Sequence, residues 1–143
     1  MLGKSPMMRG FSSGLSLSAG SYLRVLDRRD ILAGEMDRFL ADWDAWICPV
    51  ASVPAFKHLR VWQRGRGFSI GGRRISYEMA AGAYATIFNL TGNPVVVMPL
   101  TLSSEGLPIG VQLIGRRWHD MELLAIAEQL AEVAGPFRRP PGY

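Results

Sequence analysis

The side chains that could form a reactive centre are few in this sequence. Cys48 and His119 could act as a thiolate nucleophile and its base. Cys48, however, lies inside the apolar segment 45–50, where thiols usually pack inertly. His58 and His119 each stand apart from other ligands, whereas a metal site needs three or four clustered ones. The sequence therefore predicts no metal, no cofactor and no cysteine chemistry.

Two further patterns imitate catalytic motifs. Asp42 and Asp44 flank Trp43 at the junction between an expected helix and an expected strand, where solvated aspartates are common. The segment 10–16, of sequence GFSSGLS, resembles a glycine-serine nucleophile loop, and Lys4 lies nearby as a conceivable base. Neither strand nor turn flanks this segment as such a loop requires, so we interpret it as a linker.

The positive charge of the chain is concentrated in one segment. The chain has 16 Lys and Arg residues against 12 acids, a net charge of +4. Residues 51–76 contain no acid, and the rest of the chain is slightly acidic. Three aromatic residues, Phe56, Trp62 and Phe68, alternate with the cations, as on surfaces that stack bases and follow phosphates. Solvated arginines on a long loop explain the same pattern. The cations are Lys57, Arg60, Arg64, Arg66, Arg73 and Arg74.

Hydrophobic spacing predicts three main helices. The first runs from Ser18 or Ser21 to Trp43, and its apolar residues recur at helical intervals. The second begins at the cap Ser76 and ends at the pair 91–92, because Gly92 accepts a left-handed conformation. Asp120 is expected to cap the third, which ends at 135–136.

Three apolar runs predict strands. The run 45–50 contains a proline, as a strand at the rim of a sheet does. The runs 95–100 and 109–114 are rich in β-branched residues and are joined by a turn-rich segment, which favours an antiparallel pair buried on both faces. A small hairpin between 68–70 and 74–75 is expected around the glycine pair 71–72.

These elements predict an α/β fold with helices on both sides of a sheet. We expect a flexible lead-in over 1–17, one domain over 18–135 and an irregular tail over 136–143. About three strands and three helices are too few to cover two faces and two edges. The sequence therefore indicates a part of a larger sheet that is incomplete on its own, and its open edge favours a homodimer.

Two strings resemble the C-terminal portion of the amidase signature family. They are FNLTGNPVVVMP at 88–99 and EGLPIGVQLIGR at 105–116, and the similarity extends over roughly 20–134. The family has an α/β/α fold around a large mixed sheet and hydrolyses carboxylic amides to an acid and ammonia or an amine. Asn93 departs from the pattern, because an apolar residue is commoner before Pro94.

The resemblance implies that the catalytic residues of the family lie elsewhere. Its lysine and its two serines belong to an N-terminal half, and Lys4, Ser12 and Ser13 stand too close to the C-terminal motifs to match them. We therefore expect no catalytic residue in this chain and no hydrolysis by the chain alone. A truncated gene, a split gene or a shortened chain would each explain this arrangement.

What this portion of the family contributes is the wall of the acyl pocket. The resemblance implies that Tyr84, Ile87 and Phe88, with Trp62 from the preceding loop, line that pocket, although core packing explains each equally well. In the family, subunits that use glutamine carry an acid seven residues before the asparagine that matches Asn89. This chain has Gly82 at that position. A general amidase acting on small or aryl amides therefore fits better than a tRNA-linked amidotransferase subunit.

Composition excludes several other classes of protein. The chain is 48% hydrophobic and 20% charged, as globular proteins are. No apolar run approaches a membrane span. The lone Cys48 and a start without an apolar leader predict a cytoplasmic location. The partner expected is a small amide, with nucleic acid disfavoured. The alternative prediction is a non-catalytic module that binds polyanions or nucleic acid through the basic aromatic loop 51–76.

Overall fold

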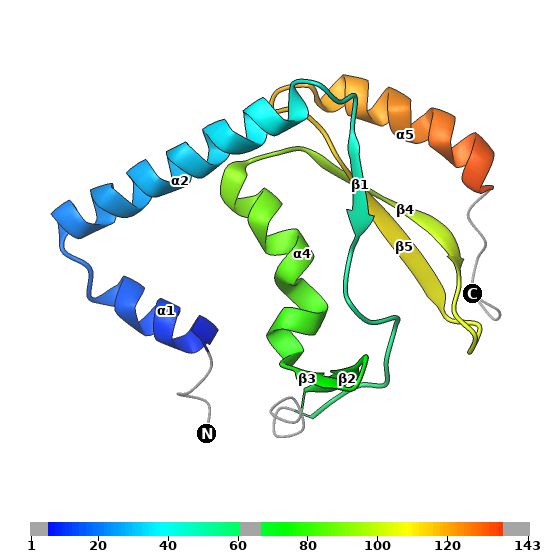
Figure 1. Cartoon of the computed structure of the whole chain (residues 1–143), viewed down its shortest axis with the longest axis horizontal. Coiled ribbons are helices and arrows are strands. Elements are labelled where there is room, and N and C mark those ends of the chain that lie inside the picture. Colours follow the sequence, from blue (N-terminus) through cyan, green and yellow to red (C-terminus); the bar gives the residue numbers. More distant parts are fainter. Residues whose placement is uncertain (1–5, 61–66, 136–143) are drawn as a thin grey trace.

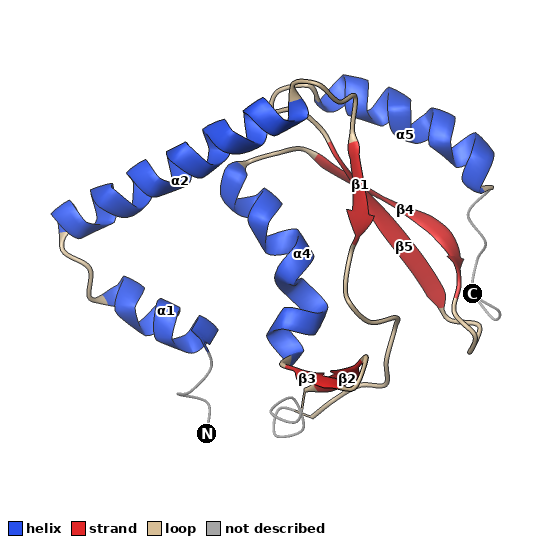
Figure 2. Ribbon diagram, in the orientation of Figure 1, coloured by secondary structure: helices blue, strands red, loops and turns tan. Residues whose placement is uncertain are grey.

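The computed structural model describes residues 6–60 and 67–135. Its elements are four helices, a three-stranded antiparallel sheet of order β1-β5-β4 and a separate hairpin of β2 and β3 (Figures 1 and 2). The helices are α1 (Pro6–Leu15), α2 (Ala19–Leu40), α4 (Tyr77–Thr91) and α5 (Asp120–Ala134). The strands are β1 (Trp46–Pro49), β2 (Phe68–Ile70), β3 (Arg73–Ile75), β4 (Val95–Leu102) and β5 (Pro108–Ile114).

Local capping explains where the helices begin and end. The Ser18 hydroxyl accepts a hydrogen bond from the Ser21 N–H at the start of α2, and Ser76 does the same for Met79 at the start of α4. Gly92 ends α4 in a left-handed conformation. The predicted bounds of these helices are confirmed to within three residues. At α5 the prediction was wrong, because Asp120 is the first helical residue and His119 precedes it without a side-chain cap.

A helix also forms inside the segment for which a flexible lead-in was expected. Helix α1 begins at Pro6, a residue favoured in the first turn because its missing N–H would be unpaired there anyway. Phe11 and Leu15 follow at helical spacing, and both are exposed. The extension of α2 and α1 away from the sheet is visible in Figure 1.

Two apolar clusters lie on opposite faces of the sheet. On one face, Met36 and Leu40 of α2 and Phe88 of α4 pack against Cys48 and Ile114. On the other face, a second cluster packs beneath α5; its buried members are Met98, Leu113 and Leu123. The predicted layering of helices on both sides of a sheet is therefore confirmed, and the described strands are antiparallel rather than mixed.

Strand β4 is less buried than its sequence predicted. Only Met98 is buried in it, whereas the run was expected to be covered on both faces. The reason is that α5 covers one face, while α4 and α2 contact the part of the sheet nearer β1.

None of the helices in the described part of the chain combines the length and apolarity that crossing a membrane requires.

Candidate functional site

Helix α4 forms the centre of the candidate site. Almost all its residues are apolar or small, and a helix that is apolar on all sides is normally enclosed by protein. Here only Ala80, Phe88 and Thr91 are buried. Met79, Tyr84 and Leu90 are exposed, so part of the apolar surface of α4 is left uncovered by the described residues.

The four residues predicted to line a pocket have different surroundings. Phe88 belongs to the core, where its ring meets Trp46 edge-on with the ring centroids 5.6 Å apart. Ile87 packs against the same cluster from the side. The side of α4 that carries Tyr84 is more open, and this residue is 39% exposed. Trp62 lies outside the described residues. A pocket-lining role stays a prediction for all four, with Tyr84 the most accessible of those described.

The loop that follows β1 is fastened to α4. The Ser52 N–H donates a 2.8 Å hydrogen bond to the Ala80 carbonyl in the first half of the helix. Beside this contact lies a hollow of about 370 Å³, lined by Val50–Ala55 and by Pro108–Gly110 at the start of β5. Gly82, two residues beyond Ala80, has no atom within 4 Å of the place that a Cβ would occupy. This part of the helix therefore has room for a larger side chain or for a ligand.

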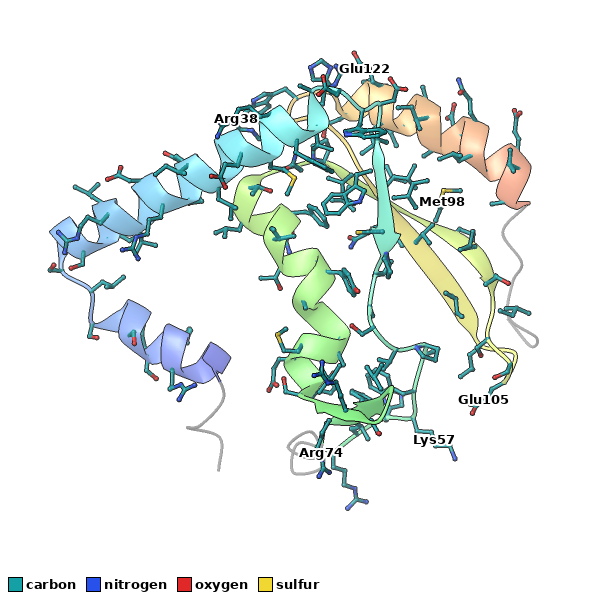
Figure 3. The ribbon with its side chains drawn as sticks, in the orientation of Figure 1. Arg38, Lys57, Arg74, Met98, Glu105 and Glu122 are labelled. Carbon is teal, nitrogen blue, oxygen red and sulfur yellow. The ribbon has the colours of Figure 1, made fainter. Side chains whose placement is uncertain are left out.

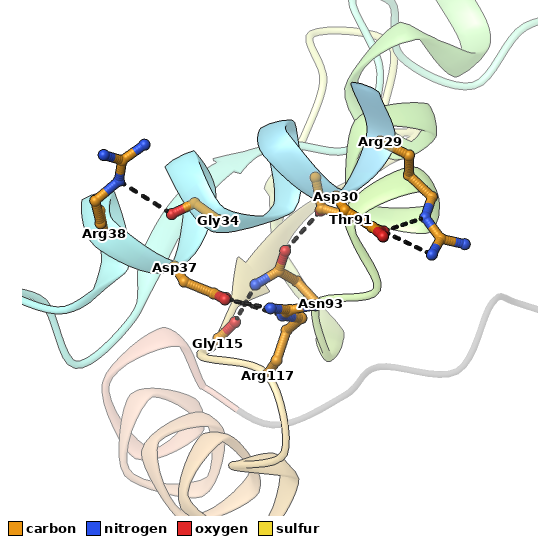
Figure 4. Close-up of polar contacts among 9 residues, drawn as sticks. All are labelled: Arg29, Asp30, Gly34, Asp37, Arg38, Thr91, Asn93, Gly115 and Arg117. Carbon is orange, nitrogen blue, oxygen red and sulfur yellow. Dashed lines mark hydrogen bonds and ion pairs between the residues drawn. The ribbon is translucent and has the colours of Figure 1, made fainter. Parts of the chain in front are cut away.

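Asn93 links the end of α4 to the end of β5, a role that sequence reasoning missed. Its side-chain N–H donates to the Gly115 carbonyl at 2.9 Å, and its oxygen lies 2.6 Å from the Thr91 hydroxyl (Figure 4). Asn93 and Thr91 are both buried. The Gly115 N–H returns a hydrogen bond to the Pro94 carbonyl. The only signal in the sequence was the departure of Asn93 from the apolar residue that is commoner in the resembled family.

An ion pair fastens α2 to the loop between β5 and α5. Arg117 donates through two nitrogens to the two carboxylate oxygens of Asp37, with Nε 3.0 Å from Oδ1 (Figure 4). Both side chains are partly exposed.

Next to this pair, Trp118 is 91% exposed and is the only described residue other than glycine with a positive φ, at 69°. A second, smaller hollow of about 290 Å³ lies between Trp118, Asp120 and the end of α4.

Cys48 is held in the core as a neutral thiol. Burial raises the pKa of Cys48, and the hydrogen bond from Gln112 opposes that rise. The Gln112 amide lies 3.3 Å from the sulfur and donates to the Pro49 carbonyl at 2.8 Å. His119 is occupied elsewhere, since its Nδ1 lies 3.0 Å from Glu122 Oε2. The described residues contain no group of three or more metal ligands.

Glu122 makes a pH-dependent contribution at the start of α5. Hydrogen bonds from His119 and then Arg116 lower the pKa of Glu122. A lowered folded-state pKa gives stability that is present above the unfolded pKa and is lost as pH falls through the folded pKa. We expect Glu122→Gln to remove a small acid-dependent part of the unfolding free energy. Urea unfolding of both proteins at several pH values tests this; parallel curves from pH 7 to pH 3 would contradict it.

The aromatic residues of the basic loop pack together. The ring centroids of Phe56 and Phe68 are 4.7 Å apart, and Tyr77 at the start of α4 closes the cluster at 5.9 Å from Phe56. These contacts hold the hairpin of β2 and β3 against α4. Lys57 and Arg74 lie at this end of the molecule (Figure 3). Phe56 and Phe68 thus pack against each other and against Tyr77, while Phe56 remains 42% exposed.

Comparison with known proteins decides the family. A sequence model of the Amidase family matches residues 6–124, most of the chain. The chain belongs to the Amidase family. A glutamyl-tRNA(Gln) amidotransferase subunit from Xanthobacter autotrophicus is 32% identical over 126 residues, which are 85% of this chain and 24% of the relative. The 6-aminohexanoate-cyclic-dimer hydrolase of Paenarthrobacter ureafaciens is 32% identical over 128 residues, 84% of this chain and 25% of the relative.

Solved structures agree with this assignment to the Amidase family. A 6-aminohexanoate cyclic dimer hydrolase superposes with a TM-score of 0.68 at 27% identity, covering 87% of this chain and 27% of its own. A protein from a complex related to an s-triazine catabolic enzyme superposes with the same score and identity, covering 93% and 28%. This Amidase chain spans about a quarter of the length of the curated relatives it matches.

Proposed function

We propose that this chain is the C-terminal part of an amidase that hydrolyses carboxylic amides to an acid and ammonia or an amine. The observation that carries the proposal is α4, an apolar helix of a chain in the Amidase family on which Met79, Tyr84 and Leu90 are left exposed by the described residues. In a complete enzyme this surface, with Tyr84 and Ile87, forms the wall of the acyl pocket. Phe88 supports that wall from the core.

The substrate we propose is a small or aryl amide without a charged group near the scissile bond. Gly82 supports this class, because it stands where the resembled glutamine-using subunits carry an acid. The space beside Gly82 is open, so the described residues do not themselves exclude such an acid. The reaction takes place in the cytoplasm, a location that rests on the sequence alone.

The nucleophile, its relay serine and its base come from an N-terminal part in this proposal. Of the serines that could substitute for them, Ser12 and Ser13 lie on helix α1 rather than in a loop. Just after the end of α1, the exposed Ser16 hydroxyl donates a hydrogen bond to the Ser13 carbonyl. Two observations support the absence of hydrolysis by the isolated chain. Ser12 and Ser13 lie on a helix, and the chain spans only about a quarter of the length of its relatives.

An activity assay with reconstitution tests the proposal. The purified chain alone is expected to release no ammonia from benzamide or acetamide above a buffer control. Co-expression with the N-terminal three quarters of an amidase, whether encoded upstream of Met1 or taken from a relative, is expected to give hydrolysis that a serine-directed inhibitor abolishes. Inhibitor-sensitive hydrolysis by the chain alone would contradict silence, and Ser12→Ala and Ser13→Ala would then locate the nucleophile.

The same preparations distinguish the polyanion-binding alternative. Binding through several cations weakens steeply as salt concentration rises. We expect only weak binding of single-stranded DNA by the chain, because the Phe56 and Phe68 rings that would stack on bases pack against each other and against Tyr77. Tight binding at low salt that Arg73→Ala weakens would favour the alternative.

A further inference from the structure

Strand β4 has an outer edge that no described strand occupies. It is the last strand of the order β1-β5-β4, and β5 is its one neighbour. Pro99 shows which backbone groups of β4 face this outer edge. Pro99 pairs with Gly110, and a proline has no N–H to donate to a ladder. Its carbonyl therefore points away from β5.

The direction of the Pro99 carbonyl fixes the direction of the other backbone groups of β4. Backbone groups of successive residues point to opposite sides, and β4 keeps an unbroken register with β5 from Val95 to Pro99. The N–H and C=O groups of Val95 and Val97 therefore point outward with the carbonyl of Pro99. Those of Val96 and Met98 bond to β5. The outer edge thus carries two donors and three acceptors.

The side chains along this edge are apolar and open. Val97 is 59% exposed, and Val95 is also exposed. Both point to the face opposite α5, since they pair with Ile114 and Gln112, whereas Val96 packs beneath α5. Apolar side chains beside unpaired backbone groups are the features that attract another strand.

The opposite edge of the sheet is poorly suited to the same purpose. Strand β1 has four residues and ends at Pro49. Pro49 pairs with Val111, so by the same reasoning Ile47 is the only residue of β1 with both an N–H and a C=O on the outer side. One open edge and one blunted edge favour a closed pair of chains over a fibre.

We propose that the isolated chain forms a two-fold dimer in which β4 pairs antiparallel with β4 of a second copy, centred on Val97. This register places Val97 opposite Val97 and Val95 opposite Pro99 of the other copy. The two Val97 residues exchange two hydrogen bonds, and each Val95 N–H donates to a Pro99 carbonyl. The register uses the whole regular stretch from Val95 to Pro99 and stops before the bulge that follows Pro99.

This inference goes beyond the proposed amidase function, because it concerns the chain without its N-terminal part. The product is a six-stranded sheet of order β1-β5-β4-β4-β5-β1.

A register centred on Val96 would overlap only the three strand residues 95–97, because Pro94 precedes the strand. The longer overlap is the reason for choosing Val97.

Sedimentation of the wild-type chain is the first arm of the test. The expected mass is twice the 15.8 kDa of one chain. Val97→Lys places two like charges opposite each other at the centre of the register and is expected to shift the sedimenting species to the 15.8 kDa monomer. A circular dichroism spectrum of the variant checks that it is folded. A wild-type monomer, or a broad series of larger species, would overturn the proposal.

Cross-linking is the second arm and reports the register. Residues opposite each other in a hydrogen-bonded pair have Cα atoms about 5.5 Å apart, within the range of a disulfide. In a Cys48→Ala background, Val97→Cys is expected to form a covalent dimer under mild oxidation. The matched control Val96→Cys lies beneath α5 and is expected to stay uncross-linked. Cross-linking of the Val96 variant as readily as the Val97 variant would overturn the register.

Discussion

Phe88→Ala is expected to lower the free energy of unfolding by about 3–5 kcal/mol, the usual cost of removing a buried aromatic ring. Phe88 packs with Met36 and Leu40 of α2, with Cys48 of β1 and with Ile114 of β5, and it meets the Trp46 ring edge-on. The cavity would therefore lie where four elements meet. Because small domains have unfolding free energies of about 5–15 kcal/mol, this loss threatens the fold itself.

Urea unfolding followed by circular dichroism measures the effect of Phe88→Ala. The matched control is Leu90→Ala, an apolar residue on the same helix that is 48% exposed, and its expected cost is under about 1 kcal/mol. Equal losses in the two variants would show that Phe88 is not part of the core. In a reconstituted amidase, Tyr84→Ala would then separate the role of the pocket wall from that of the core, since it is expected to change substrate preference more than stability.

Asn93→Leu is expected to cost about 1–3 kcal/mol, because it leaves a buried carbonyl without its donor. The Gly115 carbonyl would lose the Asn93 amide, whereas the Thr91 hydroxyl still has the Ile87 carbonyl 3.0 Å away. Leucine stands for the apolar residue that the resemblance leads us to expect before Pro94. The loss would show that this junction depends on asparagine.

A double-mutant cycle tests the connection between Asn93 and Thr91. Residues in one hydrogen-bond network have non-additive effects, so Asn93→Leu with Thr91→Val should cost less than the sum of the single variants. The control Asn89→Leu changes an exposed amide on α4, and its expected effect is within about 0.5 kcal/mol. Additive effects at 91 and 93, or a cost at 93 no larger than at 89, would refute the role given to this junction.

The features predicted well from the sequence are those set by neighbouring residues. The cap Ser76 and the left-handed Gly92 determine α4 within a few residues of chain, so both of its ends were predictable. The hairpin of β2 and β3 follows in the same way from Gly71 and Gly72.

The features that were missed depend on residues far along the chain. Asn93 bonds to Gly115, and Asp37 bonds to Arg117, and neither spacing follows a local pattern. The exposure of β4 depends on which helix covers which face, and periodicity does not determine that. The candidate site shares this difficulty, because the burial of Phe88 is set by α2 and β1 while its helical position is set by α4.

The order of strands in the sheet has a consequence for how the chain folds. Strands β4 and β5 are joined by a short turn, so their pairing closes a small loop. Strand β1 pairs with β5 through Cys48 and Gln112, and this pairing must close a loop that contains the basic segment and all of α4. Closing a longer loop costs more chain entropy, and pairing between distant segments is slow. The hairpin of β4 and β5 is therefore the natural starting point of folding, and β1 joins it late, completing the hollow beside Ser52 as one of the last steps.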